Sequence, residues 1–194
     1  SMMNSQLMIS SILTHAERNF PTTEMVSVTM DNPRHRQTYK TFASRCRQLA
    51  NGLNSLGAKF GDRIGTLAWN DYRHMELYYG VSGSGMVCHT INPKLFPEQV
   101  AYIINHAEDR FLFVDVLVMP LLEALKDHLT KVEVIVVLTD KANMPDTSLP
   151  NVLCYEELLS AQSDEFAWPE FDENTASGMC YTSGTTGNPK GVVY

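Results

Sequence analysis

The stretch Val132–Leu138, VEVIVVL, decides the fold class because it is almost wholly apolar. A strand with one face in water alternates apolar and polar residues, whereas a continuous apolar run is typical of a strand that is buried on both faces. Strands of that kind occur in parallel sheets that helices cover on each side. This stretch therefore predicts a central strand of a parallel sheet.

The segments on either side of this strand alternate between strand-like and helix-like patterns. The clearest helix has apolar residues at three- and four-residue steps from Phe42 to Leu56, and Gly57 is placed to end it. Strands are predicted at 24–30, 63–69, 86–91, 111–115, 132–138 and 177–183, and helices at 7–20, 42–56, from 70 or 71, at 97–107, 119–129 and 155–161. The first helix is expected to bury a side that carries Leu7, Ile12, Leu13 and Ala16. Strands that alternate with helices predict an α/β fold with a mostly parallel sheet flanked by helices.

Composition excludes several classes of protein. The 194 residues suit one domain, or a domain and part of another. The net charge of −7 (15 basic minus 22 acidic residues) argues against a nucleic-acid binder. No apolar run approaches the roughly 18 residues of a membrane span. The scattered cysteines Cys46, Cys88, Cys154 and Cys180 are typical of reduced thiols, which favours a cytoplasmic protein.

A loop rich in glycine and hydroxyl residues, Thr182–Gly191, follows the last predicted strand. Its three glycines allow consecutive backbone N–H groups to face an anion, and Lys190 adds a positive charge. The loop is therefore interpreted as a phosphate cradle. A flexible linker has a similar composition, but linkers rarely leave directly from an apolar strand. The Walker A pattern and the GxGxxG pattern of kinases are both absent from this loop.

The ordered sequence YTSGTTGNPKGVVY (Tyr181–Tyr194) closely resembles the AMP-binding signature of the adenylate-forming enzymes. These enzymes comprise acyl-CoA synthetases, adenylation domains of nonribosomal peptide synthesis and luciferases. The resemblance extends over Thr38–Asp115, and there the chain is most similar to bacterial medium- and long-chain fatty acyl-CoA synthetases. The segments HTINPKL (89–95) and NHAEDRFLFVD (105–115) carry most of that likeness, although His89-Thr90 stands where many relatives have proline.

The resemblance implies an activity and a set of contacts. The activity is joining a fatty acid to CoA at the expense of ATP, through an acyl-adenylate, with Mg²⁺ as the metal. Thr182 is implied as a hydroxyl contact to Mg²⁺, and Lys190 as a contact to the outer phosphates. The remaining cofactor-binding residues that the resemblance implies are Ser183, Gly184, Thr185, Thr186 and Gly187.

The resemblance also implies that residues 1–194 are the N-terminal portion of the AMP-binding large domain, without a catalytic residue. Alone, this portion is expected to fold, to bind ATP weakly and to be inactive. A sheet edge left apolar would favour a homodimer. Two alternatives stay open: an enzyme that adenylates an aromatic or amino acid, and a truncated chain that serves only as an interaction module.

Three histidines and one short run carry weaker signals of a functional site. His74, His89 and His106 share no metal-ligand spacing, so we expect surface positions or satisfied core positions for them. The run Trp69–Tyr72 follows a predicted strand, where α/β enzymes place ligands, and it is a candidate border of the acyl pocket.

Overall fold

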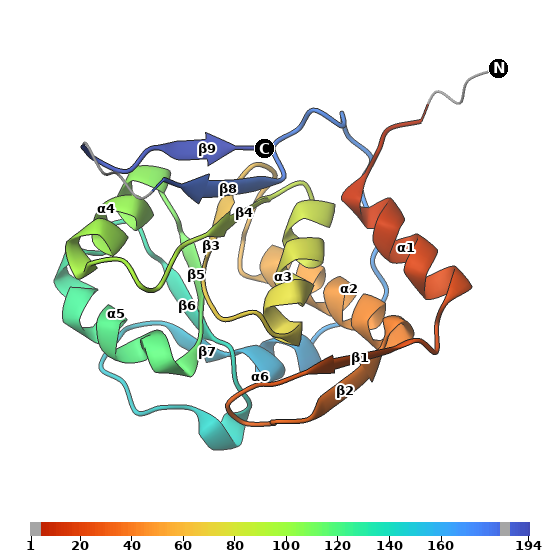
Figure 1. Ribbon diagram of the computed structural model, residues 1–194, viewed down its shortest axis with the longest axis horizontal. Coiled ribbons are helices and arrows are strands. Elements are labelled where there is room, and N and C mark those ends of the chain that lie inside the picture. Colours follow the sequence, from red (N-terminus) through yellow and green to blue (C-terminus); the bar gives the residue numbers. More distant parts are fainter. Residues whose placement is uncertain (1–4, 183–186) are drawn as a thin grey trace.

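The computed structural model describes residues 5–182 and 187–194, and its centre is a seven-stranded sheet (Figure 1). The strand order is β7-β6-β5-β3-β4-β8-β9, and every neighbouring pair is parallel except β8 and β9. The strands are β3 (Arg63–Leu67), β4 (Val87–Thr90), β5 (Phe111–Val114), β6 (Val134–Val137), β7 (Val152–Cys154), β8 (Gly178–Tyr181) and β9 (Gly191–Val193). The predicted α/β fold with a mostly parallel sheet is confirmed.

Helices cover both faces of this sheet (Figure 1). The helices α2, α3 and α6 pack on one face, and α4 and α5 pack on the other. The helices are α1 (Ile9–Asn19), α2 (Tyr39–Ser55), α3 (Tyr72–Gly83), α4 (Pro97–Ala107), α5 (Met119–Leu125) and α6 (Tyr155–Ser160), with short 3₁₀ turns at Val116–Val118, Lys126–His128 and Lys141–Asn143. Within the described residues, no helix is both long and apolar enough to cross a membrane.

The stretch VEVIVVL contains β6, which lies between β5 and β7 as a strand buried on both faces. Val137 packs in the core on the α4 side, and Val136 packs in the core on the α2 side. Each of these side chains is 0% exposed. Two apolar cores, one on each face, therefore hold the sheet, as the continuous apolar run predicts.

Two predicted helix ends are confirmed, at Gly57 after α2 and at Asp71 before α3, whereas α2 begins three residues earlier than predicted. The Thr38 hydroxyl accepts a hydrogen bond from the backbone N–H of Thr41 at the start of α2, and Gly57 after its end has a positive φ of 83°. Asp71 accepts from the backbone N–H of His74 at the start of α3. These caps satisfy backbone groups that have no partner within a helix.

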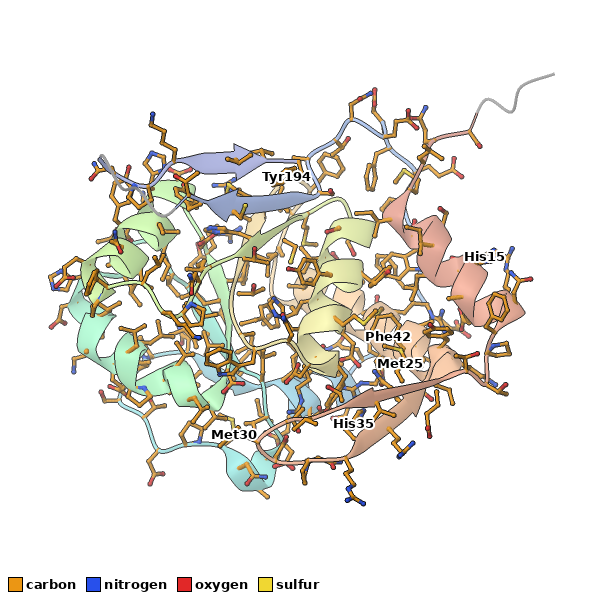
Figure 2. All side chains as sticks on the ribbon, viewed as in Figure 1. His15, Met25, Met30, His35, Phe42 and Tyr194 are labelled. Carbon is orange, nitrogen blue, oxygen red and sulfur yellow. The ribbon has the colours of Figure 1, made fainter. Side chains whose placement is uncertain are left out.

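A small antiparallel hairpin of β1 (Glu24–Ser27) and β2 (His35–Thr38) precedes the main sheet. Leu13 of α1 and Phe42 of α2 belong to a satellite core, and Met25 of the hairpin packs against it. Figure 2 labels Met25 and Phe42. The expected buried side of α1 was partly wrong, because Ile12 is 58% exposed and Leu7 is 82% exposed. Leu7 precedes the helix, and α1 meets α2 and α3 through a narrow stripe around Leu13.

Three short strands were not predicted: β2, β7 and β9. The strand β2 reads HRQT, which has no alternation of apolar and polar residues. The strand β7 has only three residues, too few to show such an alternation. The strand β9 lies at an edge of the sheet, and there Val193 is 58% exposed and Tyr194 is 70% exposed. This edge is apolar as expected, and self-association through it stays a prediction.

A cluster of charged residues joins the helices on the α2 face to the turn of the hairpin. Arg45 of α2 holds Glu76 of α3 through two hydrogen bonds of 2.6 and 3.1 Å, and it also contacts Glu156 of α6 at 2.9 Å. Arg73 of α3 bridges Glu156 at 2.8 Å and Asp31 at 2.7 Å. We call these five residues the charge network. It ties four segments together beside the sheet.

The Asp31 carboxylate should make the charge network sensitive to acid. Burial by itself would raise its pKa, but hydrogen bonds from Arg73 and Thr29 outweigh burial and lower the pKa from 3.8 to about 2. Because the folded-state pKa lies below the unfolded one, the stability from this ionisation is present above about pH 4 and is lost as pH falls through about 2. Asp31→Asn should therefore lower the unfolding free energy at pH 6, and its difference from the wild type should shrink toward pH 2.

Urea denaturation at a series of pH values measures this difference. Asp127→Asn, at an exposed carboxylate, is the matched control and should leave the acid dependence unchanged. A constant gap between Asp31→Asn and the wild type across the series would contradict the assignment.

Candidate functional site

The predicted phosphate loop leaves the carboxyl end of β8, which pairs in parallel with β4. Its two ends meet at Thr182 and Lys190, and we call this pair the neck of the loop. The backbone N–H of Thr182 donates to the Lys190 carbonyl at 3.0 Å, and the N–H of Lys190 donates to the Thr182 hydroxyl oxygen at 3.3 Å. The neck continues the antiparallel pairing of β8 and β9, in which Tyr181 stands opposite Gly191. Thr182 and Lys190, which the motif separates by eight positions, are therefore neighbours.

The groups at the neck suit an anion. Lys190 is exposed, and Thr182 is exposed beside it. The Thr182 hydroxyl accepts from Lys190, so its own hydrogen stays available to a ligand oxygen. Gly187 is exposed as well, with nothing within 4 Å of the place where a Cβ would stand. The other predicted contacts, Ser183, Gly184, Thr185 and Thr186, lie outside the described residues.

The fit of Mg²⁺ to these residues depends on oxygen ligands. A hydroxyl oxygen such as that of Thr182 is of the type Mg²⁺ accepts, and Mg²⁺ is commonly held by one or two protein oxygens together with substrate phosphates and water. Among residues 5–182 and 187–194, no group of three His, Cys, Asp or Glu side chains could form a metal cage. The Thr182 hydroxyl therefore fits a Mg²⁺ that substrate phosphates also hold, and this contact stays a prediction.

Tyr181, the last residue of β8, packs under the neck and was not predicted as a site residue. Its hydroxyl lies 2.7 Å from Nδ1 of His106 on α4, and its ring lies 5.3 Å from the ring of His89 on β4. Across the hairpin, the Tyr181 ring stands 3.1 Å from where a Cβ on Gly191 would lie. Burial, with the nearby charge of Asp109, raises the pKa of Tyr181. The hydroxyl therefore stays protonated at neutral pH.

His89 is held by a buried carboxylate. Its Nδ1 lies 2.7 Å from Asp109, two residues before β5, and both side chains are 0% exposed. Its Nε2 is buried and has no hydrogen-bond partner among the described residues. Gly65 of β3 makes room for the pair, because a Cβ there would stand 3.0 Å from an Asp109 carboxylate oxygen. The expectation of a satisfied core histidine is thus right for one nitrogen of His89 and wrong for the other.

The other two histidines follow the expectation. His74 is buried and bonds the Thr66 hydroxyl at 3.0 Å and the Trp69 carbonyl at 3.2 Å. His106 is exposed on α4. Burial lowers the pKa of His74, although the bond to the Trp69 carbonyl works against that shift. His74 therefore has a structural role at the carboxyl end of β3.

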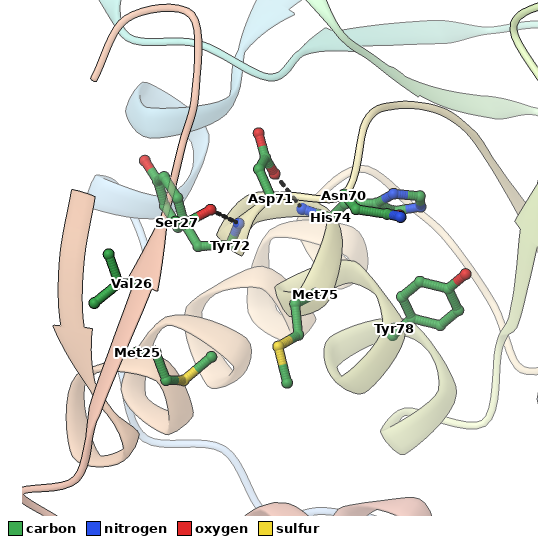
Figure 3. A pocket seen from close by; sticks show the side chains of 9 residues that line it. All are labelled: Met25, Val26, Ser27, Asn70, Asp71, Tyr72, His74, Met75 and Tyr78. Carbon is green, nitrogen blue, oxygen red and sulfur yellow. Dashed lines mark hydrogen bonds between the residues drawn. The ribbon is translucent and has the colours of Figure 1, made fainter. Parts of the chain in front are cut away.

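A cavity of about 330 Å³ lies beside the run Trp69–Tyr72 (Figure 3). Its wall contains three residues of that run, Asn70, Asp71 and Tyr72. The rest of the wall comes from β1 and α3: Met25, Val26, Ser27, His74, Met75 and Tyr78. Figure 3 shows the Ser27 hydroxyl bonded to the backbone N–H of Tyr72, at 3.0 Å. Mostly apolar side chains surround this space, so a border of the acyl pocket at this run stays a prediction.

Comparisons with known proteins match this arrangement over almost the whole chain. A family model described as AMP-binding enzyme matches residues 13–194. A 3-methylmercaptopropionyl-CoA ligase of Ruegeria lacuscaerulensis is 50% identical over 193 residues, which are 100% of this chain and 36% of that protein. A medium-chain-fatty-acid–CoA ligase of Ectopseudomonas oleovorans is 45% identical over 193 residues, again 100% of this chain and 35% of that protein.

A solved structure shares the fold. The crystal structure of an anthranilate CoA ligase in complex with anthranoyl-AMP matches with a TM-score of 0.82 at 24% identity, over 99% of this chain and 35% of that one. The chain therefore spans about a third of the length of these relatives. At this identity, the structural likeness bears on the fold alone.

Proposed function

The chain belongs to the AMP-binding enzyme family, and from this membership we propose that the full-length protein is a fatty acid–CoA ligase that works through an acyl-adenylate. The observation that carries the proposal is whole-chain identity of 50% and 45% to two CoA ligases. Residues 1–194 would form the N-terminal portion of the large domain. The four cysteines are free, which supports a cytoplasmic location as part of the proposal.

Two displacements make up the proposed reaction. The carboxylate oxygen of the fatty acid attacks the α-phosphorus of ATP, and the bond to the β-phosphate oxygen breaks, which releases pyrophosphate and leaves acyl-AMP. The thiol of CoA then loses its proton and attacks the acyl carbonyl, and AMP leaves as the thioester forms. Charge develops on pyrophosphate in the first step only, so groups that hold those phosphates should favour that step.

The neck of the loop supplies groups for the first step. We assign Lys190 to the outer phosphates, because its exposed side chain begins where the two ends of the loop meet. We assign the Thr182 hydroxyl to Mg²⁺, which when bound would neutralise charge on the phosphates. Gly187 and the residues from Ser183 to Thr186 complete the proposed cradle through their backbone N–H groups and hydroxyls.

The acid that is activated belongs to the proposal as well. The relative at 45% identity is a medium-chain-fatty-acid–CoA ligase, which favours a fatty acid of medium or long chain. The relative at 50% identity is a 3-methylmercaptopropionyl-CoA ligase, which favours a short thioether acid as the second candidate. Both candidates are apolar acids without an amino group.

We expect the full-length protein to release AMP faster with fatty acids of medium or long chain than with any amino acid. The physical reason is that an apolar pocket binds an alkyl chain and leaves a charged ammonium group unpaired. A coupled assay of AMP release with ATP, Mg²⁺ and CoA measures the preference. The acids to compare are octanoate, palmitate, 3-methylmercaptopropionate, benzoate and phenylalanine.

The same series of acids includes the outcomes that would contradict the proposed substrate class. A higher kcat/KM with phenylalanine or benzoate than with both fatty acids would overturn the proposed substrate class. Absence of AMP release with every acid would point instead to an interaction module. A preference for 3-methylmercaptopropionate would select the second candidate.

A further inference from the structure

We propose that Tyr181 is a positioning residue for the adenylation step. Its side chain holds the neck of the phosphate loop against α4 and β4, and we call these contacts the clamp. The inference rests on the proposed function, because it concerns the site that would hold the departing phosphates. Tyr181 directly precedes Thr182, so a shift of its ring moves the first residue of the loop. The loop would thus depend on a side chain that belongs to the sheet.

The Tyr181 side chain contacts three elements that come from distant parts of the sequence. Its hydroxyl bonds His106 of α4 at 2.7 Å, and its ring lies against His89 of β4. The same ring fills the space beside Gly191, where β9 begins. Tyr181 therefore reaches both strands of the neck and the helix next to it.

The clamp is fixed at both ends. On the inner end, His89 cannot turn freely, because its Nδ1 lies 2.7 Å from Asp109 and both residues are fully buried. On the outer end, the His106 ring stacks on Tyr102 at 5.2 Å with an angle of 27° between the planes. Tyr102 lies one helical turn before His106, so α4 holds the ring in place. A tyrosine between two fixed rings has few alternative positions.

The position of the neck matters because the transferred group must lie in line with the attacking oxygen. The Thr182 hydroxyl and Lys190 are joined by one hydrogen bond of 3.3 Å, so they move together when the neck moves. A displacement of about 1 Å at a reacting centre can lower a rate about 100-fold. Loss of the tyrosine hydroxyl leaves the ring in place, so the expected effect is smaller.

The test compares half-reactions in the full-length protein. Tyr181→Phe should lower the rate of ATP–pyrophosphate exchange with fatty acid roughly tenfold, since one positioning hydrogen bond is lost. Thioester formation from supplied acyl-AMP and CoA should stay within roughly twofold of the wild type, because no pyrophosphate takes part in it. The urea midpoint of unfolding should stay unchanged.

Variants of the partner separate positioning from a general loss of structure. His106→Leu should reproduce the loss of exchange, and Tyr181→Phe with His106→Leu should be no slower than either single change. His106→Asn should restore most of the rate, because the asparagine amide places a hydrogen-bonding atom near the position of Nδ1. Tyr79→Phe is the matched control, since among the described residues its hydroxyl makes no hydrogen bond, and it should behave as the wild type.

The outcomes distinguish the inference from the function on which it rests. If the wild type shows no exchange with any fatty acid, the proposed function fails. If the wild type exchanges and Tyr181→Phe exchanges as fast, the function stands and the clamp is overturned. Equal slowing of both half-reactions, or no rescue by His106→Asn, would likewise overturn a positioning role.

Discussion

Lys190→Ala in the full-length protein should slow formation of acyl-AMP about 100- to 1,000-fold, which corresponds to about 2.7–4 kcal/mol of transition-state stabilisation. The side chain is exposed at the neck of the loop, where its charge can meet phosphate oxygens. Charge on those oxygens grows as pyrophosphate departs, so the contact is strongest in the transition state. ATP–pyrophosphate exchange with a fatty acid measures this step.

The second half-reaction is the internal control for this variant. Thioester formation from supplied acyl-AMP and CoA should change far less, because no pyrophosphate is present in that step. Lys59→Ala, at another exposed lysine away from the loop, should leave both half-reactions unchanged. Equal slowing of both half-reactions by Lys190→Ala would assign Lys190 to a different role.

The sequence correctly predicted the elements that depend on interactions between residues close together in the chain. The helical period from Phe42 to Leu56 corresponds to α2, and VEVIVVL corresponds to a strand buried on both faces. The loop was predicted to follow an apolar strand, and its described ends adjoin β8 and β9; its binding of phosphate stays a prediction. The family was predicted from the same residues and is confirmed.

The parts that were missed depend on contacts between distant residues. His89 and Asp109 lie twenty positions apart, and nothing in either local sequence indicates that they form a buried pair. The role of Tyr181 depends on His106, which approaches from another element. The only available signal was the position of an aromatic residue at the first place of the loop motif. The pattern of strand β9 was hidden because its apolar residues end the motif that was interpreted as a loop.

Replacement of Glu76 by leucine should lower the free energy of unfolding by about 3–5 kcal/mol, the range found when one partner of a buried ion pair is removed. Glu76 is 0% exposed, although the helical period of α3 alone would place an apolar residue at a core position. Its carboxylate accepts from Arg45 at 2.6 Å and from the Tyr155 hydroxyl at 2.8 Å. The buried Tyr155 hydroxyl and the partly buried Arg45 guanidinium would both lose this acceptor.

The size of this effect follows from what remains after the change. Arg45 keeps Glu156, so its charge is still partly compensated. The Tyr155 side chain is 0% exposed, so its hydroxyl would stay buried without this acceptor. Glu76→Gln should therefore destabilise less than leucine does, because the amide oxygen can still accept from one of the two donors.

Urea denaturation measures both variants, and the exposed pair of Glu157 with Lys141 offers the matched control. Glu157 also lies on a helix and meets a cation at 2.7 Å, yet its side chain is 52% exposed. Glu157→Leu should change the unfolding free energy far less, because water already solvates both partners of that pair. If Glu76→Leu proved as mild as Glu157→Leu, burial would not decide the strength of these pairs. The charge network would then contribute little to holding α2, α3 and α6 against the sheet that carries the phosphate loop.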